Sequence, residues 1–554
     1  MEKFDYIIIG AGSAGCVLAN RLSENPANSV LLLEAGDRDR NPLIHIPGAY
    51  TKLFKQSFDW GFWSEPQTHV NNRKIYLPRG KTLGGCSSTN AMAYVRGNRA
   101  DYDGWAAMGN EGWSYYEVLP HFKKSESYQQ IDQADRHYRG ADGELNVEIP
   151  ENHRTPYSEA FIEAGKQIGL PANDDYNGVR QQGVGRFQMT VKNGKRHSGA
   201  VAFLRPALQR PNLTVRTKSA VKKIILKNDQ AVGVEFFKNK TQTAEVFANK
   251  EVILSAGAFH SPQILMLSGI GEKTELEQQG IDCLKELVGV GKNLQDHLFV
   301  PVSASTKQQE GLNHHLKIHN QLIGLGNYLF RTKGPFTRSP LEAYAFFNLD
   351  DFQTTPNFQY HFAPICIGKG YDYDMYDQDS FPATDGMTIL PSLLHPESRG
   401  YVGLRSANPQ AAPVIQPNFL SKEADLKALI KGTKIALELI HQPAFDAYRK
   451  EILAPLDSSS DEAIAEHIRK SVETIYHPVG TCKMGTDEMA VVDAELRVHG
   501  IDGLRVVDAS IMPKIVTGNT NAPVYMIAEK AATMILQPTE KRSVSNKKLD
   551  EAVS

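Results

Sequence analysis

Histidine is the side chain of this sequence best suited to taking a proton near neutral pH, because its unperturbed pKa is about 6.5. The chain has 17 histidines, and a single one is far more often a surface or structural residue than a catalytic base. His477 precedes Pro478, which disfavours helix at His477 and predicts a loop after a helix expected over residues 461–473. Because catalytic side chains concentrate on loops held by a rigid scaffold, His477 is a candidate base.

Patterns for other kinds of catalysis and for metal binding are absent from the sequence. It contains neither a G-x-S-x-G nucleophile motif nor an H-E-x-x-H zinc motif. His315 and His319 are four residues apart, but no acidic motif accompanies them, so we expect no metal site. Cys86 has no neighbour in sequence that would lower its pKa, which favours a small buried residue over a nucleophile. The cysteines form no C-x-x-C pair, which excludes a zinc ribbon, a cysteine-ligated iron–sulfur cluster and a thioredoxin-type redox pair.

A glycine-rich turn near the start of the sequence predicts a dinucleotide-binding site. Gly10-x-Gly12-x-x-Gly15 follows an expected strand and opens an expected helix, and Glu34 ends the next strand. Gly10 allows the tight turn, Gly12 lets a pyrophosphate approach the backbone, and Gly15 lets the helix pack on the sheet. The helix start offers N–H groups to phosphates, while Glu34 can accept hydrogen bonds from ribose hydroxyls and would repel a 2′-phosphate. The sequence has no second such unit, which favours one permanently held FAD over NAD and leaves an NAD-dependent enzyme as an alternative.

The elements that would carry these residues alternate along the start of the chain. Residues 4–9 and 30–34 are short apolar runs of the kind found in buried parallel strands, and residues 16–22 between them have a helical pattern. Further strand-like runs cover residues 213–215, 231–237 and 252–254. Residues 36–80, rich in proline, asparagine and aromatic residues, predict a long excursion over the surface. The sequence therefore predicts an α/β protein that begins with a βαβ unit.

The size and composition are those of a large globular protein. The chain has 554 residues, of which 41% are hydrophobic and 22% charged, and its formal net charge is −2. It is long enough to bury a core without disulfides, and its near-neutral charge argues against a nucleic-acid-binding protein. The first residues show no signal-peptide pattern, and no uncharged run is long enough to span a membrane. With few cysteines and an odd number of them, these features lead us to expect a cytoplasmic protein.

Further motifs follow one another from residue 80 to residue 523. The first two are GKTLGGCSSTNAMAYVRG at 80–97 and GAFHSPQILMLSGIG at 257–271. They are followed by GVGKNLQDH at 289–297, YHPVGT at 476–481, DAS at 508–510 and NTNAP at 519–523. In this order the motifs resemble those of the glucose–methanol–choline (GMC) oxidoreductases. The resemblance covers residues 4–536 and is strongest to choline dehydrogenases and bacterial dehydrogenases of aliphatic alcohols.

The resemblance implies a Rossmann-type FAD-binding domain interleaved with a substrate domain built on an antiparallel sheet. We expect the FAD domain to comprise residues 1–155, 215–300 and 475–536, the substrate domain 156–214 and 301–474, and a mobile tail 537–554. The residues that the resemblance places against FAD are Gly10, Gly12, Ser13, Ala14, Gly15, Glu34, Ala35, Leu83, Gly84, Gly85, Asn90, Ala91, Met92, Ala93, Val221, Asp508 and Ala509. From the residues alone, Asp508 is also explained as the cap of a turn.

Within the resemblance, His477 matches the catalytic histidine of the family and Asn521 matches its partner. The amide N–H of such a partner can hydrogen-bond the substrate oxygen as negative charge develops on it. Asn521 is equally well explained as the N-cap of a helix that continues through Pro523, and the two roles are compatible. Members with covalently bound flavin carry histidine at the position of Thr89, so the resemblance implies noncovalent FAD. Cys86 stands where most members have serine or glycine, and its role stays open.

The resemblance and the composition of residues 300–400 together suggest a substrate. Aromatic residues there, including Tyr371, Tyr373, Tyr376 and Phe381, predict a substrate-facing region. Apolar residues that favour a neutral alcohol are Phe346, Phe347, Phe358, Tyr360, Phe362, Ile365 and Ile367. The acids Asp372, Asp374, Asp377 and Asp379 are expected to lie in a solvated loop instead of a pocket for a quaternary ammonium.

These observations predict oxidation of a primary alcohol to an aldehyde by hydride transfer to FAD, with His477 as base. We expect the electrons to pass to a quinone or another non-oxygen acceptor, an arrangement compatible with peripheral association at the inner face of a membrane. The alternatives are an oxygen-using alcohol oxidase, a choline dehydrogenase, a lyase or light-driven decarboxylase of the same fold, and a non-catalytic flavoprotein. The oligomeric state is left open.

Overall fold

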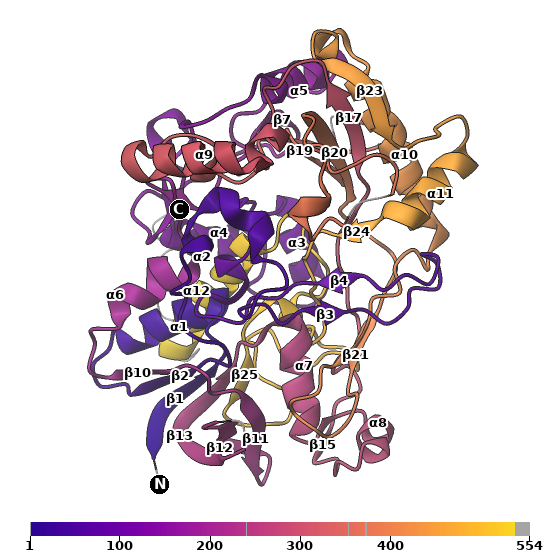
Figure 1. Cartoon of the computed structure of the whole chain (residues 1–554). Helices are drawn as coiled ribbons and strands as arrows, with labels where there is room; N and C mark the ends of the chain where they lie inside the picture. The colour runs from indigo at the N-terminus through magenta and orange to yellow at the C-terminus, as the bar shows by residue number, and fades with distance from the viewer. Residues whose placement is uncertain (1, 240, 353, 372–373, 538–554) are drawn as a thin grey trace, which may run out of the picture.

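The computed structural model describes residues 2–239, 241–352, 354–371 and 374–537, and two sheets organise them (Figure 1). One sheet lies at the bottom of the molecule in Figure 1 and the other at its top, with helices on both. Of the tail expected at 537–554, only Gln537 lies within the described residues.

The lower sheet contains the βαβ unit that the sequence predicts. Its strands are β1 (Lys3–Ile9), β2 (Val30–Leu33), β10 (Leu213–Arg216), β11 (Val221–Lys227), β12 (Gln230–Phe237), β13 (Thr243–Leu254) and β25 (Leu504–Val506). Their order is β10-β2-β1-β13-β12-β11, with β25 also paired to β13. β1 pairs in parallel with both β2 and β13, so that Ile8 lies beside Leu32 and Ile253. Because these side chains are buried, the strands consist of apolar runs and not of an alternating pattern.

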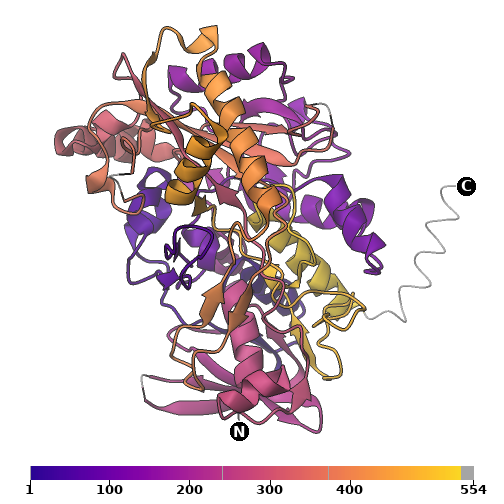
Figure 2. The same ribbon diagram turned by 90° about the vertical axis from the view of Figure 1, so that its right-hand side faces the viewer.

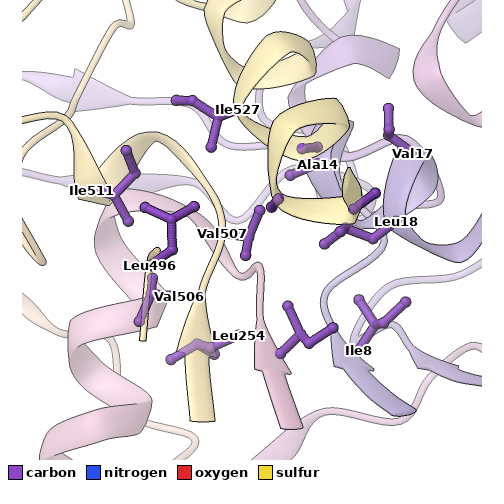
Figure 3. Packing of buried hydrophobic residues seen from close by; sticks show 14 of the residues in the cluster. Ile8, Ala14, Val17, Leu18, Leu254, Leu496, Val506, Val507, Ile511 and Ile527 are labelled. Atoms are coloured by element: carbon purple, nitrogen blue, oxygen red, sulfur yellow. The ribbon is translucent and has the colours of Figure 1, made fainter. Parts of the chain in front are cut away.

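Two helices from opposite ends of the chain cover one face of this sheet. They are α1 (Ser13–Ser23) and α12 (Asn521–Leu536). Figure 3 shows Ala14 and Leu18 of α1 and Ile527 of α12 gathered above the strands that carry Ile8 and Leu254. Between the helices, the buried Arg21 guanidinium lies 2.7 Å from Glu529 Oε1, which joins the N-terminal unit to the C-terminal helix.

The upper sheet is antiparallel throughout, as the resemblance implies. Its strands are β7 (Gly183–Arg186), β16 (Leu298–Phe299), β17 (Val302–Thr306), β18 (Ala343–Phe347), β19 (Phe358–Ala363), β20 (Gly386–Leu393), β23 (Arg449–Ala454) and β24 (Glu473–Thr474). Helices α5 (Pro156–Gln167), α10 (Glu423–Ile440) and α11 (Asp461–Ser471) share a core with it. Ser460 caps α11 by accepting from the Ala463 amide, which confirms a helix start there; the helix ends at Ser471 and not at 473.

Much of the aromatic run that was expected to face the substrate instead fills the cores around this sheet. Phe347, Phe358, Tyr360 and Phe362 belong to the core beneath α10 and α5. Phe346 packs in a smaller cluster on the same sheet. The apolar character of these strands therefore reflects burial on both faces of the sheet.

Residues 36–80 run over the surface only in part, because exposed and buried residues alternate along them. They form α2 (Pro42–His45), the 3₁₀ turn η1 (Pro47–Leu53), β3 (Phe62–Trp63) and β4 (Tyr76–Leu77). Ile44, Leu53, Phe58 and Phe62 are buried. This segment lies between the two sheets in Figure 1. Phe54, Phe58, Phe62 and Tyr76 are buried, whereas Trp63 is exposed.

The remaining helices and short strands lie outside the two large sheets. The helices are α3 (Arg99–Ala107), α4 (Tyr115–Ser125), α6 (Arg205–Ala207), α7 (Gly257–Leu267), α8 (Lys273–Gln278) and α9 (Ile318–Arg331). Short strands are β5 (Glu126–Tyr128), β6 (Leu145–Val147), β8 (Val191–Lys192), β9 (Lys195–Arg196), β14 (Ile270–Gly271), β15 (Lys285–Glu286), β21 (Tyr401–Gly403) and β22 (Val414–Gln416). β10 spans the expected domain limit at 215, and β16 belongs to the upper sheet although it precedes the limit at 300. The domain limits themselves stay a prediction.

Candidate active site

A cavity of about 1120 Å³ lies between the two sheets. Ile9, Leu33 and Ser255, at the carboxyl ends of β1, β2 and β13, line one part of it. His361 of β19 and Thr388 of β20 line another part. The volume exceeds the roughly 300–1,000 Å³ of most small-ligand pockets, so the cavity can hold a dinucleotide together with a small substrate.

The glycines of the N-terminal turn shape the first part of the cavity as the fingerprint requires. Gly10 has φ +98°, and a Cβ there would lie 2.6 Å from the Ser255 carbonyl oxygen. A Cβ on Gly15 would lie 1.9 Å from the Gly10 oxygen, so Gly15 lets α1 pack against the turn. Gly12 lines the cavity, and a Cβ added to it would meet nothing within 4 Å. The start of α1 thus presents bare backbone to an open space, which fits a pyrophosphate.

Glu34 lines this end of the cavity. Its carboxylate accepts hydrogen bonds from the Ala11 amide at 2.8 Å and the Gly36 amide at 2.7 Å. Burial raises the pKa of Glu34 to about 7. Ribose hydroxyls would add the polar partners that this desolvated carboxylate lacks.

Most of the residues predicted to contact the dinucleotide line the cavity. Those that do are Gly10, Gly12, Ser13, Ala14, Glu34, Ala35, Gly85, Asn90, Ala91, Met92, Ala93, Val221, Asp508 and Ala509. Gly15, Leu83 and Gly84 do not line it, and lie behind the lining. The Gly84 amide donates to the Ala11 carbonyl oxygen at 2.7 Å, so this glycine holds the turn in place from behind.

Asp508 has the turn-capping contacts that the sequence also allowed. Its Oδ1 accepts from the amide and hydroxyl of Ser510, and its Oδ2 accepts from the Gly257 amide and the Ser261 hydroxyl. The carboxylate therefore fixes the start of α7 against the 3₁₀ turn η9 (Ala509–Ile511). It positions the cavity wall next to Ala509.

His477 lies on a loop after β24 and lines the other part of the cavity. Its amide donates to Asp296 Oδ1 at 2.7 Å, and the Thr474 hydroxyl donates to Asp296 Oδ2 at 2.5 Å. Burial raises the pKa of Asp296 to about 6. Tyr476, just before His477, has φ +69°. A non-glycine residue in that region stores roughly 1–3 kcal/mol of strain, which the contacts of Asp296 help to offset.

The hydrogen bonds around His477 fix where its proton lies. His297 Nε2 is 3.0 Å from the Leu394 carbonyl oxygen, which can only accept, so Nε2 carries the hydrogen. Burial lowers the pKa of His297 to about 3, so its ring is neutral and its Nδ1 must accept. His477 Nδ1 lies 3.0 Å from that atom and therefore donates to it.

It follows that the other nitrogen of His477 is unprotonated. Burial and the neighbouring ring of His297 hold the pKa of His477 well below its usual range, so its ring too is neutral. Its Nε2 accepts from Asn519 Nδ2 at 3.1 Å. The geometry thus presents the lone pair of His477 Nε2, beside an amide N–H of Asn519, at the wall of the cavity.

The partner of His477 in the structure is Asn519 and not Asn521, which the sequence favoured. Asn521 lines the cavity, but its Oδ1 accepts from the Ser13 hydroxyl at 2.6 Å. Asn521 is also not the N-cap of α12: it is the first helical residue, and the cap position is Thr520. Asn521 therefore ties α12 to the start of α1, while Asn519, in the loop before it, reaches His477.

His361 is a further residue that sequence reasoning missed. It lines the cavity from β19 and is fully buried, and the Asn519 side chain is the polar group that influences its ring. Burial lowers the pKa of His361 to about 3. No motif marked it, because it lies inside an apolar strand whose register alone turns it toward the cavity.

Beside His477, the Arg79 guanidinium donates to the Tyr476 carbonyl oxygen at 2.7 Å, and much of the rest of the cavity lining is apolar. It includes Phe299, Leu341, Ala363, Ile365, Ile367, Met375, Phe381 and Leu390. Of the residues expected to face the substrate, Ile365, Ile367 and Phe381 line the cavity, whereas Tyr371 and Tyr376 do not. Tyr373 lies outside the described residues, as does Asp372, which was expected in a solvated loop. Asp374 is exposed and pairs with Lys55 at 2.8 Å, and Asp377 and Asp379 are exposed too, in agreement with a solvated loop.

Thr89 and Cys86 both line the cavity, and the Gly80 amide donates to Cys86 Sγ at 3.5 Å. Among the described residues, no group of three or more histidine, cysteine, aspartate or glutamate side chains is arranged to hold a metal ion. The helices of that part of the chain include none long and apolar enough to cross a membrane.

Comparisons with known proteins agree with the motifs. The N-terminal GMC oxidoreductase family model matches residues 4–299, and the C-terminal one matches residues 396–528. An alcohol dehydrogenase [acceptor] from Pseudomonas putida is 43% identical, over 98% of this chain and 97% of that protein. An oxygen-dependent choline dehydrogenase from Photobacterium profundum is 43% identical, over 97% of this chain and 93% of that protein.

Solved structures share the fold over nearly the whole chain. Pyridoxine 4-oxidase from Mesorbium loti superposes with a TM-score of 0.86 at 32% identity, covering 96% of this chain and 99% of that one. A variant formate oxidase of Aspergillus oryzae, studied for FAD modification, superposes with a TM-score of 0.90 at 28% identity, covering 98% and 99% of the two chains.

Proposed function

Since the chain belongs to the GMC oxidoreductase family, it is an oxidoreductase, and we propose that it oxidises a neutral, largely apolar primary alcohol to an aldehyde. The observation that carries this proposal is the position of His477 Nε2, which we assign as unprotonated from its hydrogen bonds, at the cavity wall next to the amide of Asn519. A base and an oxygen-binding donor at one point are what removal of a hydroxyl proton requires.

We propose FAD as the cofactor. The open backbone at Gly12, the start of α1 and the desolvated Glu34 fit its dinucleotide part. When bound, FAD supplies the acceptor for the hydride that leaves the alcohol carbon. Thr89 lines the cavity at the position where covalently flavinylated members carry histidine. Because a threonine hydroxyl cannot form a histidyl link, we take the flavin to be noncovalent.

The chain's own residues handle the proton and the oxygen. His477 Nε2 takes the hydroxyl proton when the substrate displaces the Asn519 N–H that it accepts in the structure, and His297 keeps the tautomer that leaves this nitrogen unprotonated. The Asn519 N–H donates to the substrate oxygen as its negative charge grows. The neutral rings of His297 and His361 beside the site, together with the apolar lining, exclude water from it.

Support for a neutral substrate comes from the carboxylates of the cavity wall. Those among the described residues are Glu34, Asp59 and Asp508, and each accepts hydrogen bonds from backbone amides of the protein. Each of these carboxylates is thus already engaged by the protein, which argues against a carboxylate held ready for a quaternary ammonium. Choline is therefore the second candidate substrate, which the name of a relative supports and the residues of the cavity wall do not.

The acceptor and the location follow from the same proposal. We propose a quinone or another non-oxygen acceptor; the name of the Pseudomonas putida relative specifies only an acceptor, and that of the Photobacterium profundum relative specifies oxygen. Peripheral contact with a membrane would bring the site close to such an acceptor. An oxygen-using oxidase is the alternative, supported by the oxidases among the solved relatives.

The test is anaerobic reduction of the bound flavin, followed at its visible absorbance, with medium-chain, aromatic and choline substrates. We expect neutral alcohols to reduce it fastest, and His477→Ala to lose roughly 10²–10⁴ in rate with FAD still bound. The exposed His441→Ala is the matched control. An unchanged rate in His477→Ala would contradict the proposal that His477 is the base. Faster reduction by choline than by every neutral alcohol would contradict the proposed substrate. If peroxide formed in air as fast as the enzyme reduces an artificial dye, the proposal of a non-oxygen acceptor would be wrong.

A further inference from the structure

Helix α9 (Ile318–Arg331) turns its apolar residues away from the protein. Six large apolar side chains of this helix are exposed: Ile318 by 71%, Leu322 by 63%, Ile323 by 62%, Leu325 by 37%, Leu329 by 63% and Phe330 by 89%. We call this set the α9 face. In both Figure 1 and Figure 2 the helix lies along the outside of the molecule.

The side of α9 that contacts the protein is instead small and polar. Gly324 and Tyr328 are buried, and a Cβ on Gly324 would come within 3.1 Å of the Phe336 ring. Asn320 Nδ2 donates to the His314 carbonyl oxygen at 2.8 Å, and Gln321 Nε2 to the Leu316 oxygen at 2.6 Å. A helix of a water-soluble surface has the opposite arrangement, with its polar residues outward. A contiguous exposed apolar face of this kind marks an interaction surface.

The charges around the α9 face indicate what covers it. Residues 311–341 contain no aspartate or glutamate. The exposed cations Lys317, Arg331 and Lys333 lie at the two ends of the helix, and none of them forms an ion pair with a carboxylate in the described part of the chain. Apolar residues flanked by cations, with no acids among them, match the surface of an anionic bilayer. The apolar residues would contact the acyl chains there, and the cations would contact the headgroups.

The α9 face also lies close to the wall of the cavity. Gln321 Oε1 accepts from Lys52 Nζ at 2.9 Å, and Lys52 belongs to η1, whose Tyr50 and Leu53 line the cavity. α9 packs as well on the 3₁₀ turn η6 (Pro335–Thr337), which in turn contacts η1. A surface that received α9 would therefore be adjacent to the cavity.

We propose that α9 docks the protein on a bilayer that carries anionic headgroups, with the α9 face inserted at the headgroup boundary. Resting on the function proposed above, this would place the cavity beside apolar alcohols and quinones dissolved in the lipid. The docking itself does not depend on that function, because it requires only the α9 face and its cations.

The test is co-sedimentation of the full chain with vesicles of phosphatidylcholine and phosphatidylglycerol, beside vesicles of phosphatidylcholine alone. We expect binding to the anionic vesicles that weakens with salt, and a loss on the order of tenfold or more in the combined variant Leu322→Ser, Leu329→Ser and Phe330→Ser. The matched control replaces three apolar residues that are exposed elsewhere, Val179, Leu284 and Leu456, with serine, and should bind as the unmodified protein does.

The outcomes separate this proposal from its rivals. Absent vesicle binding, or equal binding of the α9 variant and the control, would overturn it, as would equal binding to both kinds of vesicle. A dimer by light scattering that dissociates in the α9 variant would show that a second copy covers the face instead. Dye-linked turnover of a water-soluble alcohol should be the same in all three proteins, so a failure of the proposed activity would not be confused with a failure of docking.

Discussion

Replacing His297 should make His477 a poorer base although His477 itself is unchanged. In His297→Leu the Nδ1–H of His477 loses its acceptor at 3.0 Å and is left buried. An unsatisfied buried donor costs about 1–3 kcal/mol, and the ring avoids that cost by moving its hydrogen to Nε2, where the Asn519 amide can turn its oxygen to accept it. Nε2 is then no longer a base. At about 1.36 kcal/mol per factor of ten, the active tautomer becomes roughly 5–150-fold scarcer, and flavin reduction slows by the same factor.

His297→Asn is the comparison that isolates the tautomer. An asparagine carbonyl oxygen lies near the position of imidazole Nδ1, so it can still accept from His477 and should keep the rate within about fivefold of the unmodified protein. The assay is anaerobic stopped-flow reduction at saturating alcohol, with the flavin spectrum and thermal melting as checks on folding. Equal rates in both variants, whether both fast or both slow, would refute the argument, because then the acceptor at this position would not matter.

The remaining predictions concern the amides, pH and the flavin linkage. Asn519→Ala should slow flavin reduction roughly 10²–10³-fold, the scale of a lost oxyanion donor. Asn521→Ala should instead mainly weaken FAD binding, because it loses the contact to Ser13. Stopped-flow reduction and FAD titration measure the two effects, and a larger loss of rate in Asn521→Ala than in Asn519→Ala would contradict the assignment. Because the base is active unprotonated and the pKa of His477 lies well below its usual range, the limiting reduction rate should be flat above about pH 6.5 and fall only in acid; a decline that begins above pH 7 would contradict this. Burial lowers the pKa of His297 and His361 to about 3, so the native state resists their protonation. The free energy of unfolding should therefore fall as the pH drops below about 6.5, by up to about 1.4 kcal/mol per pH unit for each histidine. Glu34, whose pKa is raised to about 7, has the opposite effect, and urea unfolding at several pH values measures the balance. Acid precipitation should leave the yellow colour in the supernatant, since Thr89 cannot bond the flavin, and colour in the washed pellet would contradict noncovalent binding.

The parts of the fold that could be predicted are those where local sequence and burial agree. β1, α1 and β2 were found because a glycine turn separates two runs that are apolar on both faces. The same signal misled the interpretation of residues 343–363. Phe347 and Tyr360 are aromatic because β18 and β19 are covered on both sides, and composition cannot distinguish such a core strand from the wall of a pocket. The prediction for residues 36–80 was right only for their exposed part, since the proline and asparagine turns gave no sign that Phe54, Phe58 and Phe62 between them would be buried.

The site shows a sharper limit, set by the point at which a helix begins. Residues 519–521 read Asn-Thr-Asn, and the motif offers both asparagines. Because α12 starts at Asn521, that side chain belongs to the first helical turn and meets Ser13 at the start of α1, whereas Asn519 stays in the preceding loop and reaches His477. A boundary displaced by two residues would exchange the two roles, and sequence patterns rarely place a helix end more accurately than that. The relay through His297 was out of reach for a related reason. Its motif was recognised, but the tautomer depends on the Leu394 carbonyl, which only the pairing of β16 with β20 brings beside it. Chemistry that depends on which nitrogen carries a proton is thus decided by tertiary packing, even where every residue involved can be named beforehand.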